Sequence, residues 1–191
     1  MMRPGRLFRD GVATFALLAV LALFALKMNN RPEFVEKGNF YVIDGDTLSI
    51  NGERLRLKGI DAPEYRQRCQ RNGVDWGCGE EARKALATLV KTGMPECRGR
   101  DRDRYGRLLV TCMIGGLDIN AAMVRNGMAL SYGGYAAEER TAQEAKAGVW
   151  AGDFEKPRDY RHEEQMAHAN GGDPIAGLFG YLRQLVEWIA P

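Results

Sequence analysis

Apolar and polar residues alternate through much of residues 40–114, which is the spacing expected of strands with one buried face. The strong turn signal Asn51-Gly52 separates two such runs and predicts a hairpin in which Leu48 and Leu55 share one side. Turn residues between the last two runs predict a second hairpin. The predicted strands are Phe40–Ile43, Thr47–Ile50, Leu55–Ile60, Pro95–Arg100 and Arg107–Ile114.

Three stretches repeat their apolar residues at helical spacing. Glu80–Lys91 is the clearest of them, and Gly93 is its stop signal. A short helix is predicted after Asp118, which can cap it, and a third covers Ala136–Lys146. Strands that come first, with helices interleaved later, predict an α+β fold with a small antiparallel sheet or barrel. The apolar face of the first helix comprises Ala82, Leu86, Leu89 and Val90.

The beginning of the chain has the pattern of a targeting segment. Three arginines precede the 16-residue apolar stretch Gly11–Leu26, which would form a helix of about 24 Å, shorter than the ~30 Å hydrocarbon core of a membrane. We predict that residues 1–27 are a signal anchor or a signal peptide, and no clear cleavage site follows, which favours the anchor. The basic leader predicts a domain outside the cytoplasm, tethered to the membrane through residues 28–38, or secreted if the segment is cleaved.

The end of the chain is first polar and then amphipathic. Residues 153–174 are predicted to be a polar extension that wraps the surface or lacks fixed structure. Residues 175–191 are predicted to form an amphipathic helix that docks on its own domain or on a partner. A place on a membrane surface is less favoured, because the polar side of this helix carries a single arginine.

The overall charge is small, but its local distribution is uneven. The chain has 191 residues and a net charge of +2, which fits one domain with extensions and excludes a polycation. Residues 54–71 carry six basic side chains against Asp61 and Glu64, and residues 98–107 carry five arginines against two aspartates. Two basic islands favour a polyanionic ligand, although ordinary solvated surface charge would give the same pattern.

Four cysteines follow the apolar segment, and an even number in an exported chain predicts two disulfides rather than free thiols. The lack of a Cys-x-x-Cys pair argues against zinc. A hairpin centred on Asp103–Gly106 would place Cys97 directly opposite Cys112. Cross-strand neighbours lie close enough for a disulfide, so we predict Cys97–Cys112 and, by elimination, Cys69–Cys78.

Several catalytic chemistries are excluded inside the domain. Both histidines, His162 and His168, fall in the polar extension, so a Ser-His-Asp or Cys-His group is out of reach. The sequence also lacks a glycine-rich phosphate loop. Catalysis would have to use carboxylates, arginines and a hard metal ion, and Asp46 and Asp61 are candidates to hold Ca²⁺. Taken singly, each of these motifs is better explained as a turn or a strand exit.

Five blocks follow one another in order: VIDGDT (42–47), RLKGIDAPE (56–64), DRYGR (103–107), INAAMVRNGMA (119–129) and AKAGVW (145–150). Together they resemble the thermonuclease, or staphylococcal-nuclease-like, family. The resemblance implies a five-stranded OB-type antiparallel barrel with three helices over residues 39–152. It also implies a monomeric domain that hydrolyses DNA or RNA phosphodiesters with Ca²⁺, with low sequence specificity and 3′-phosphate products.

The resemblance also implies roles for individual residues. Arg56 and Arg107 match the two arginines on the scissile phosphate, and Glu64 matches the candidate general base. A metal ion would polarise a phosphoryl oxygen and hold the attacking water. The implied calcium ligands are Asp46, Asp61 and the main-chain carbonyl of Ala62.

Further residues are implied to contact the substrate. Arg104 and Tyr105 are expected to line the nucleotide pocket. Gly133 stands at one of the family's base-contacting tyrosine positions, whereas Tyr135 matches the other. Either Tyr132 compensates, or base stacking is weaker here.

The hairpin register raises a difficulty for the proposed site. A strict two-residue turn places Thr47 opposite Arg56, which leaves Asp46 on the other face of the ribbon. A bulge is therefore predicted, either between Gly45 and Ile50 or near Glu53.

Two other functions stay open from the sequence. The same arginines would suit a catalytically silent OB module that only binds nucleic acid. The domain could also be a disulfide-braced scaffold for partner proteins, with the C-terminal helix as its interface. The three intact acids favour the nuclease.

Overall fold

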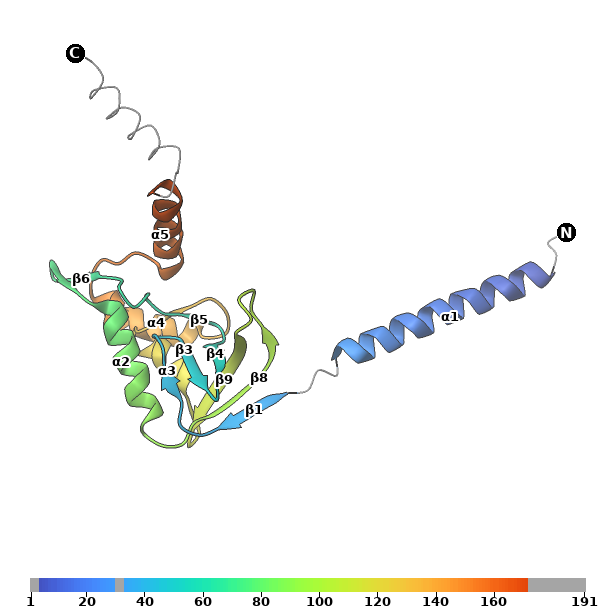
Figure 1. Ribbon diagram of the computed structural model, residues 1–191, viewed down its shortest axis with the longest axis horizontal. Helices are drawn as coiled ribbons and strands as arrows, with labels where there is room; N and C mark the ends of the chain where they lie inside the picture. Colours follow the sequence, from blue (N-terminus) through green and yellow to red (C-terminus); the bar gives the residue numbers. More distant parts are fainter. Residues whose placement is uncertain (1–3, 30–32, 172–191) are drawn as a thin grey trace, which may run out of the picture.

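The computed structural model describes residues 4–29 and 33–171 of the chain. Its globular part is a mixed α+β domain in which a curled sheet is covered by helices (Figure 1). Helices α2 (Cys78–Val90), α3 (Ile119–Arg125) and α4 (Ala136–Glu144) lie where the helical spacing predicts them. The other helical elements are α1 (Pro4–Asn29), the 3-10 helix η1 (Gly148–Ala151) and α5 (Pro157–Gly171).

The main sheet has the strand order β1-β8-β9-β4-β3-β2, and β10 pairs with β9. Its strands are β1 (Phe34–Lys37), β2 (Tyr41–Val42), β3 (Thr47–Ile50), β4 (Glu53–Leu57), β8 (Glu96–Arg102), β9 (Leu108–Ile114) and β10 (Leu117–Asp118). Two short ladders lie outside it, β5 (Ile60–Asp61) with β11 (Leu130–Ser131), and β6 (Cys69–Arg71) with β7 (Val74–Trp76).

This architecture is consistent with an OB-like fold, but it differs from a five-stranded antiparallel barrel. Within the described residues the main sheet has seven strands, and β4 and β9 pair in parallel. The extra edge strand β1 lies inside the segment predicted as a tether and pairs with β8. The sequence gives little sign of β1, because its four residues are held by the ladder with β8 more than by apolar side chains of their own.

The β3–β4 hairpin is regular, so the predicted bulge is wrong. Asn51-Gly52 forms a two-residue turn with positive φ angles of 52° and 82°, and Thr47 pairs with Arg56. Asp46 still reaches Arg56, because it precedes the first residue of β3 and lies in a bend, where side chains do not alternate. The N–H of Leu57 donates to the Asp46 carbonyl at 2.8 Å and holds this bend against β4.

The β8–β9 hairpin carries the predicted Cys97–Cys112 disulfide, with 4.0 Å between the two Cα atoms. The route to that register differs from the prediction in one respect. The turn is one residue longer, since the Asp103 N–H donates to the Arg107 carbonyl at 2.9 Å. An irregularity in β8 between Gly99 and Arg102 then restores the register at the cysteines.

The main core lies between the sheet and the helices α2 and α3. Leu48 and Leu55 form the predicted facing pair and are fully buried. The predicted apolar face of α2 packs on this core; Ala82, Leu86 and Val90 are buried and Leu89 is partly buried.

A second, smaller core forms around the other predicted disulfide, Cys69–Cys78, which joins β6 to the start of α2. Val149 of η1 is buried in it, and Trp150 and Phe154 stack edge to face with ring centroids 5.1 Å apart. This second core therefore ties the chain that follows α4 to the disulfide.

Asn120 of α3 is fully buried and joins three parts of the fold. Its Oδ1 accepts the Cys112 N–H at 3.2 Å, and its Nδ2 donates to the carbonyls of Lys58 (3.0 Å) and Val110 (3.1 Å). All three bonds lie at the parallel β4–β9 contact. Asp118 caps the same helix as predicted, since its Oδ1 accepts the Ala121 N–H at 3.0 Å.

The sequence predicts a membrane-targeting apolar segment at the start of the chain, and a polar extension followed by an amphipathic helix at its end. In the part of the chain that is described, no helix has both the length and the apolarity needed to cross a membrane. The predicted amphipathic helix over residues 175–191 lies outside the described residues. The polar extension is helical over much of its length, as α5, instead of an irregular wrap.

Replacing Asn120 by alanine should lower the free energy of unfolding by about 2–3 kcal/mol, because the three hydrogen bonds of this buried amide are lost and the Cys112 N–H is left unpaired. Urea unfolding followed by circular dichroism measures this change. The exposed Asn126, at the end of the same helix, is the control, and its alanine variant should stay within about 0.5 kcal/mol of the wild type. Equal decreases in the free energy of unfolding of the two variants would show that the hydrogen bonds of Asn120 do not stabilise the fold more than an exposed side chain does.

Candidate active site

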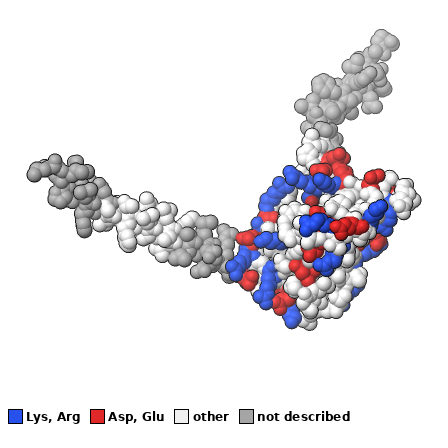
Figure 2. All heavy atoms as spheres, turned by 180° about the vertical axis from the view of Figure 1, so that it is seen from behind, with Lys and Arg blue, Asp and Glu red and all other residues white. Residues whose placement is uncertain are grey.

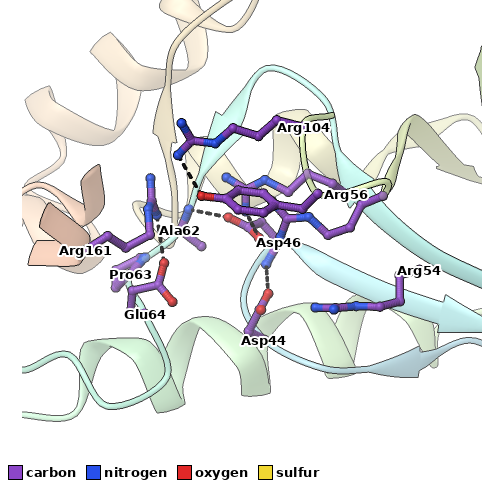
Figure 3. A pocket seen from close by; sticks show the side chains of 11 residues that line it. Asp44, Asp46, Arg54, Arg56, Ala62, Pro63, Glu64, Arg104 and Arg161 are labelled. Carbon is purple, nitrogen blue, oxygen red and sulfur yellow. Dashed lines mark hydrogen bonds and ion pairs between the residues drawn. The ribbon is translucent and has the colours of Figure 1, made fainter. Parts of the chain in front are cut away.

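A pocket of about 370 Å³ opens where the loop before β3, the strand β4, the loop after β5 and the β8–β9 turn meet. Acidic and basic side chains project into it from these elements and from α5 (Figure 3). The residues that line the pocket are Asp44, Asp46, Arg54, Arg56, Ala62, Pro63, Glu64, Arg104, Tyr105, Arg107 and Arg161.

Arg56 is the central cation of this pocket and is only 9% exposed. Its Nη1 pairs with Asp46, and its Nη2 pairs with Asp61 at 2.7 Å and also donates to the Ile60 carbonyl at 3.3 Å. A buried charge must be paired, and removing one partner of such a pair costs about 3–5 kcal/mol. Arg56 therefore fixes the directions of two carboxylates from separate segments.

Asp46 is buried and also binds the segment that carries the other acids. Its Oδ2 accepts the Ala62 N–H at 2.9 Å, and its Oδ1 accepts the Thr47 hydroxyl at 3.0 Å. Gly45 permits this approach, because a Cβ there would lie 2.7 Å from the Cβ of Ala62 and 2.8 Å from that of Ala82. The glycine of the DGDT sequence is thus required by close packing.

Glu64 lies in the loop after β5, and its side chain points toward Arg161 (Figure 3). Its Oε1 accepts from Nη1 of Arg161 at 2.8 Å, and its N–H donates to Oε1 of Gln67 at 3.1 Å. The loop is pressed against the start of α2, where a Cβ on Gly79 would lie 1.7 Å from the Glu64 carbonyl oxygen. Packing therefore fixes the backbone of Glu64, and an arginine fixes its carboxylate.

Arg161 belongs to α5 and is absent from the site predicted from the sequence. Its Nη1 and Nη2 donate to the two oxygens of Asp61, each at 3.0 Å. Burial disfavours the charged guanidinium, but the hydrogen bonds and charges of Asp61 and Glu64 outweigh it and raise the pKa of Arg161 above its ordinary value. No local motif marks this arginine, because it lies in a polar stretch, 97 residues after Glu64.

Arg107 closes the β8–β9 turn. Its Nε donates to Asp103 at 2.8 Å, and its Nη1 donates to the Thr47 hydroxyl at 3.3 Å. The Tyr105 ring lies close to two guanidiniums, with its centroid 4.8 Å from Arg104 and 5.5 Å from Arg107. The predicted residues of this turn therefore face the pocket together.

The two tyrosines predicted near α4 do not line the pocket. Tyr135 packs against the main core and donates its hydroxyl to Asp118 at 3.2 Å. Burial and the charge of Asp118 raise the pKa of Tyr135 to about 12. Tyr132 is 61% exposed. The hydroxyl of Tyr135 is thus used inside the fold, and the substrate contacts of both tyrosines stay predictions.

The donor chemistry of the pocket suits a hard cation, with two carboxylates as the side-chain ligands. Among the described residues, no three His, Cys, Asp or Glu side chains gather into a metal-binding group. Asp46 and Asp61 nevertheless converge on one guanidinium. Asp46 and Ala62 line the pocket, and Asp61 directly precedes Ala62 in the chain. Ca²⁺ prefers oxygen ligands and completes its shell with carbonyls, water or phosphate. These three residues fit such an ion.

The pocket lining carries more basic than acidic side chains. On the face drawn in Figure 2, basic and acidic side chains are interspersed over the domain. A local positive excess favours a polyanion. In the pocket lining, the basic residues Arg54, Arg56, Arg104, Arg107 and Arg161 outnumber the acidic Asp44, Asp46 and Glu64.

Comparison with known proteins agrees with this geometry. Residues 54–152 match the family described as "Staphylococcal nuclease homologue". The chain belongs to this family. The family expected from the five sequence blocks is thus confirmed, and the domain is of the thermonuclease-like endonuclease type.

Three relatives show how far the similarity to the staphylococcal nuclease homologues extends. "Succinoglycan biosynthesis protein ExoI" of Rhizobium meliloti is 40% identical over 121 residues, 59% of this chain and 63% of the relative. "Protein ParB" of Escherichia coli is 34% identical over 161 residues, 72% and 86% of the two chains. "Probable staphylococcal-like nuclease CAN2" of Oryza sativa subsp. japonica is 33% identical over 129 residues, 64% and 33%. The chain thus spans less than two thirds of ExoI and a third of CAN2.

Asp103 should make the stability of the domain depend on pH. Partial burial disfavours its charge, but hydrogen bonds from the Arg107 side chain and from the Arg107 and Tyr105 N–H groups lower the pKa of Asp103 below its ordinary 3.8. A lowered pKa gives stability that is present above the unfolded value and is lost as the pH falls through the folded value. Asp103→Asn should therefore cost about 1 kcal/mol at neutral pH, measured by urea unfolding.

The difference between wild type and Asp103→Asn should close as the pH falls below 3.8. The exposed Asp101 in β8 supplies the control variant Asp101→Asn, which should follow the wild type at each pH. A difference between wild type and Asp103→Asn that stays constant with pH would contradict the role given to the carboxylate charge.

Proposed function

We propose that this protein is a Ca²⁺-dependent nuclease that hydrolyses phosphodiester bonds of DNA or RNA with low sequence specificity and leaves 3′-phosphate ends. One observation carries the proposal: acids and arginines alternate through ion pairs in the order Asp46, Arg56, Asp61, Arg161 and Glu64, and all of them except Asp61 line a single pocket. Membership of the staphylococcal nuclease homologue family and the nuclease name of a relative support it.

The proposed cation site consists of Asp46, Asp61 and the main-chain carbonyl of Ala62. When bound, Ca²⁺ supplies a positive charge that polarises a phosphate oxygen and an attacking water. Arg56 keeps both carboxylates directed to the same place, so little reorganisation is needed when the ion binds.

The remaining steps fall to side chains of the pocket. Glu64 accepts or orients the proton of the attacking water. Arg56 and Arg107 stabilise the negative charge that develops on the phosphorus oxygens, through charge-assisted hydrogen bonds. Arginines bind the phosphate backbone, which is the same in every sequence, and this supports low sequence specificity. Arg104 and Tyr105 are proposed to contact the nucleotide next to the scissile bond.

We also propose that the domain acts as a monomer outside the cytoplasm. The two disulfides support the location outside the cytoplasm, because such bonds persist in oxidising compartments. Residues 1–27 would tether it to the membrane, or would be cleaved to release it.

The central test is cleavage of plasmid DNA and of RNA by the purified protein with Ca²⁺ and then with EGTA. Cleavage should require Ca²⁺ and should leave 3′-phosphate ends. Arg107→Lys should lower kcat by about 10²–10³-fold, because lysine cannot reproduce the bidentate contact. Arg98→Lys, outside the pocket on β8, is the matched control and should cleave at the wild-type rate.

Each contrary outcome has a clear meaning. Cleavage that survives EGTA would refute the calcium dependence. Binding of nucleic acid without cleavage would favour a silent OB module instead. A wild-type rate for Arg107→Lys would remove Arg107 from the proposed mechanism.

A further inference from the structure

A segment beyond the family match reaches back into the site. The match ends at residue 152, whereas Arg161 lies on α5 and touches two of the predicted site acids. Residues 148–157 are anchored to the domain at two places. This anchoring makes the contact of Arg161 a fixed part of the pocket.

The first anchor is the small core around the Cys69–Cys78 disulfide. Val149 is buried there, Trp150 and Phe154 stack on each other, and the N–H of Gln70 donates to the Asp153 carbonyl at 2.7 Å. The chain that leads to α5 is therefore held by apolar packing and by a backbone hydrogen bond. α5 itself starts at the buried Pro157.

The second anchor is Gln67, which is 1% exposed and lies between the site loop and the C-terminal segment. Its Nε2 donates to the Glu155 carbonyl at 2.6 Å, while its Oε1 accepts the Glu64 N–H at 3.1 Å. One buried amide thus fixes the distance between the backbone of Glu64 and the chain just before α5. These contacts place α5, and with it Arg161, at the pocket.

At the pocket, Arg161 bridges two like charges. Its Nη1 donates both to Asp61 at 3.0 Å and to Glu64 at 2.8 Å. Among the described residues, Arg161 is the cation that pairs with Glu64. Without it, two neighbouring carboxylates would repel each other, and the long side chain of Glu64 would be free to turn toward solvent.

We propose that Arg161 is a positioning residue of the active site, which holds the carboxylate of Glu64 beside Asp61, and that residues 148–161 belong to the catalytic unit. The proposal rests on the nuclease function proposed above. It extends the site beyond the matched residues, to a helix that no sequence block covers.

This role is compatible with a cation on Asp61. A carboxylate oxygen has two lone pairs. Oδ1 of Asp61 accepts from both Arg56 and Arg161, whereas among the described residues Oδ2 accepts a single hydrogen bond, from Arg161. The second lone pair of Oδ2 is left for a cation. Arg161 can therefore hold Asp61 without excluding the ion.

The test compares Arg161→Gln, Arg161→Lys, Glu64→Gln and the Arg161→Gln/Glu64→Gln double variant on one oligonucleotide with saturating Ca²⁺. Arg161→Gln should lower kcat about 10²-fold with little change in KM, because a misplaced reacting group costs that much. Arg161→Lys should recover part of the loss. The double variant should be no slower than Glu64→Gln alone, since Arg161 acts through Glu64.

Arg158→Gln is the matched control, because Arg158 is exposed on the same helix and does not line the pocket. It should retain the wild-type kcat. Losses in kcat that multiply in the double variant would overturn the proposal. A rise in both Ca²⁺ affinity, measured by calorimetry, and rate in Arg161→Gln would overturn it too, because Arg161 would then be a competitor of the cation.

Thermal unfolding of the wild type, Arg161→Gln, Glu64→Gln and the double variant separates this proposal from the proposed function. Glu64→Gln should lower Tm less in the Arg161→Gln background than in the wild type, because the pair is already broken. If the wild type cleaves nothing, the proposed function fails, and this Tm cycle alone decides on the contact. Equal Tm shifts in both backgrounds would refute it.

Discussion

The site depends on one buried guanidinium. Arg56 is held in β4 by a regular hairpin register, and it pairs with Asp46 before β3 and with Asp61 in β5. A charge in this position is tolerated only while both partners stay in place. The close packing of Gly45 on Ala62 and Ala82 brings Asp46 within reach, so core packing and site geometry are the same constraint.

From this centre, alternating charges extend across the pocket to α5. Asp61 joins Arg56 to Arg161, and Arg161 joins Asp61 to Glu64. Each of these acids pairs with an arginine that lies on another element than the acid itself. The ion pairs set the groups in place before a substrate arrives. Arg107 differs, because it lies beside an exposed turn and is oriented by Asp103 within that turn. The proposed chemistry therefore combines acids that are fixed by ion pairs with the arginines of the β8–β9 turn.

Much of this could be predicted from the sequence, wherever the determinant is local. The Asn51-Gly52 turn fixes the β3–β4 register, helical spacing finds α2 and α4, and hairpin geometry pairs Cys97 with Cys112. The predicted bulge is wrong because strand alternation does not extend to Asp46, which lies in a bend.

Other features depend on contacts that no local pattern carries. β1 is stabilised by the ladder with β8, and the hydroxyl of Tyr135 turns to Asp118 inside the fold. Arg161 reaches the site through the Cys69–Cys78 core and Gln67. A polar stretch of sequence looks the same whether or not its helix is anchored in this way.

The central claim is that Asp46 and Asp61, held by Arg56, form a cation site. Calorimetric titration of Ca²⁺ into the wild type, Asp61→Asn and Asp75→Asn tests this directly, since the side chain of Asp75 in β7 accepts a hydrogen bond from Gln70 on an exposed hairpin and does not line the pocket. We expect one Ca²⁺ to bind to the wild type and to Asp75→Asn, and at least about a tenfold weaker affinity in Asp61→Asn. Equal binding by all three proteins, or none by the wild type, would contradict it.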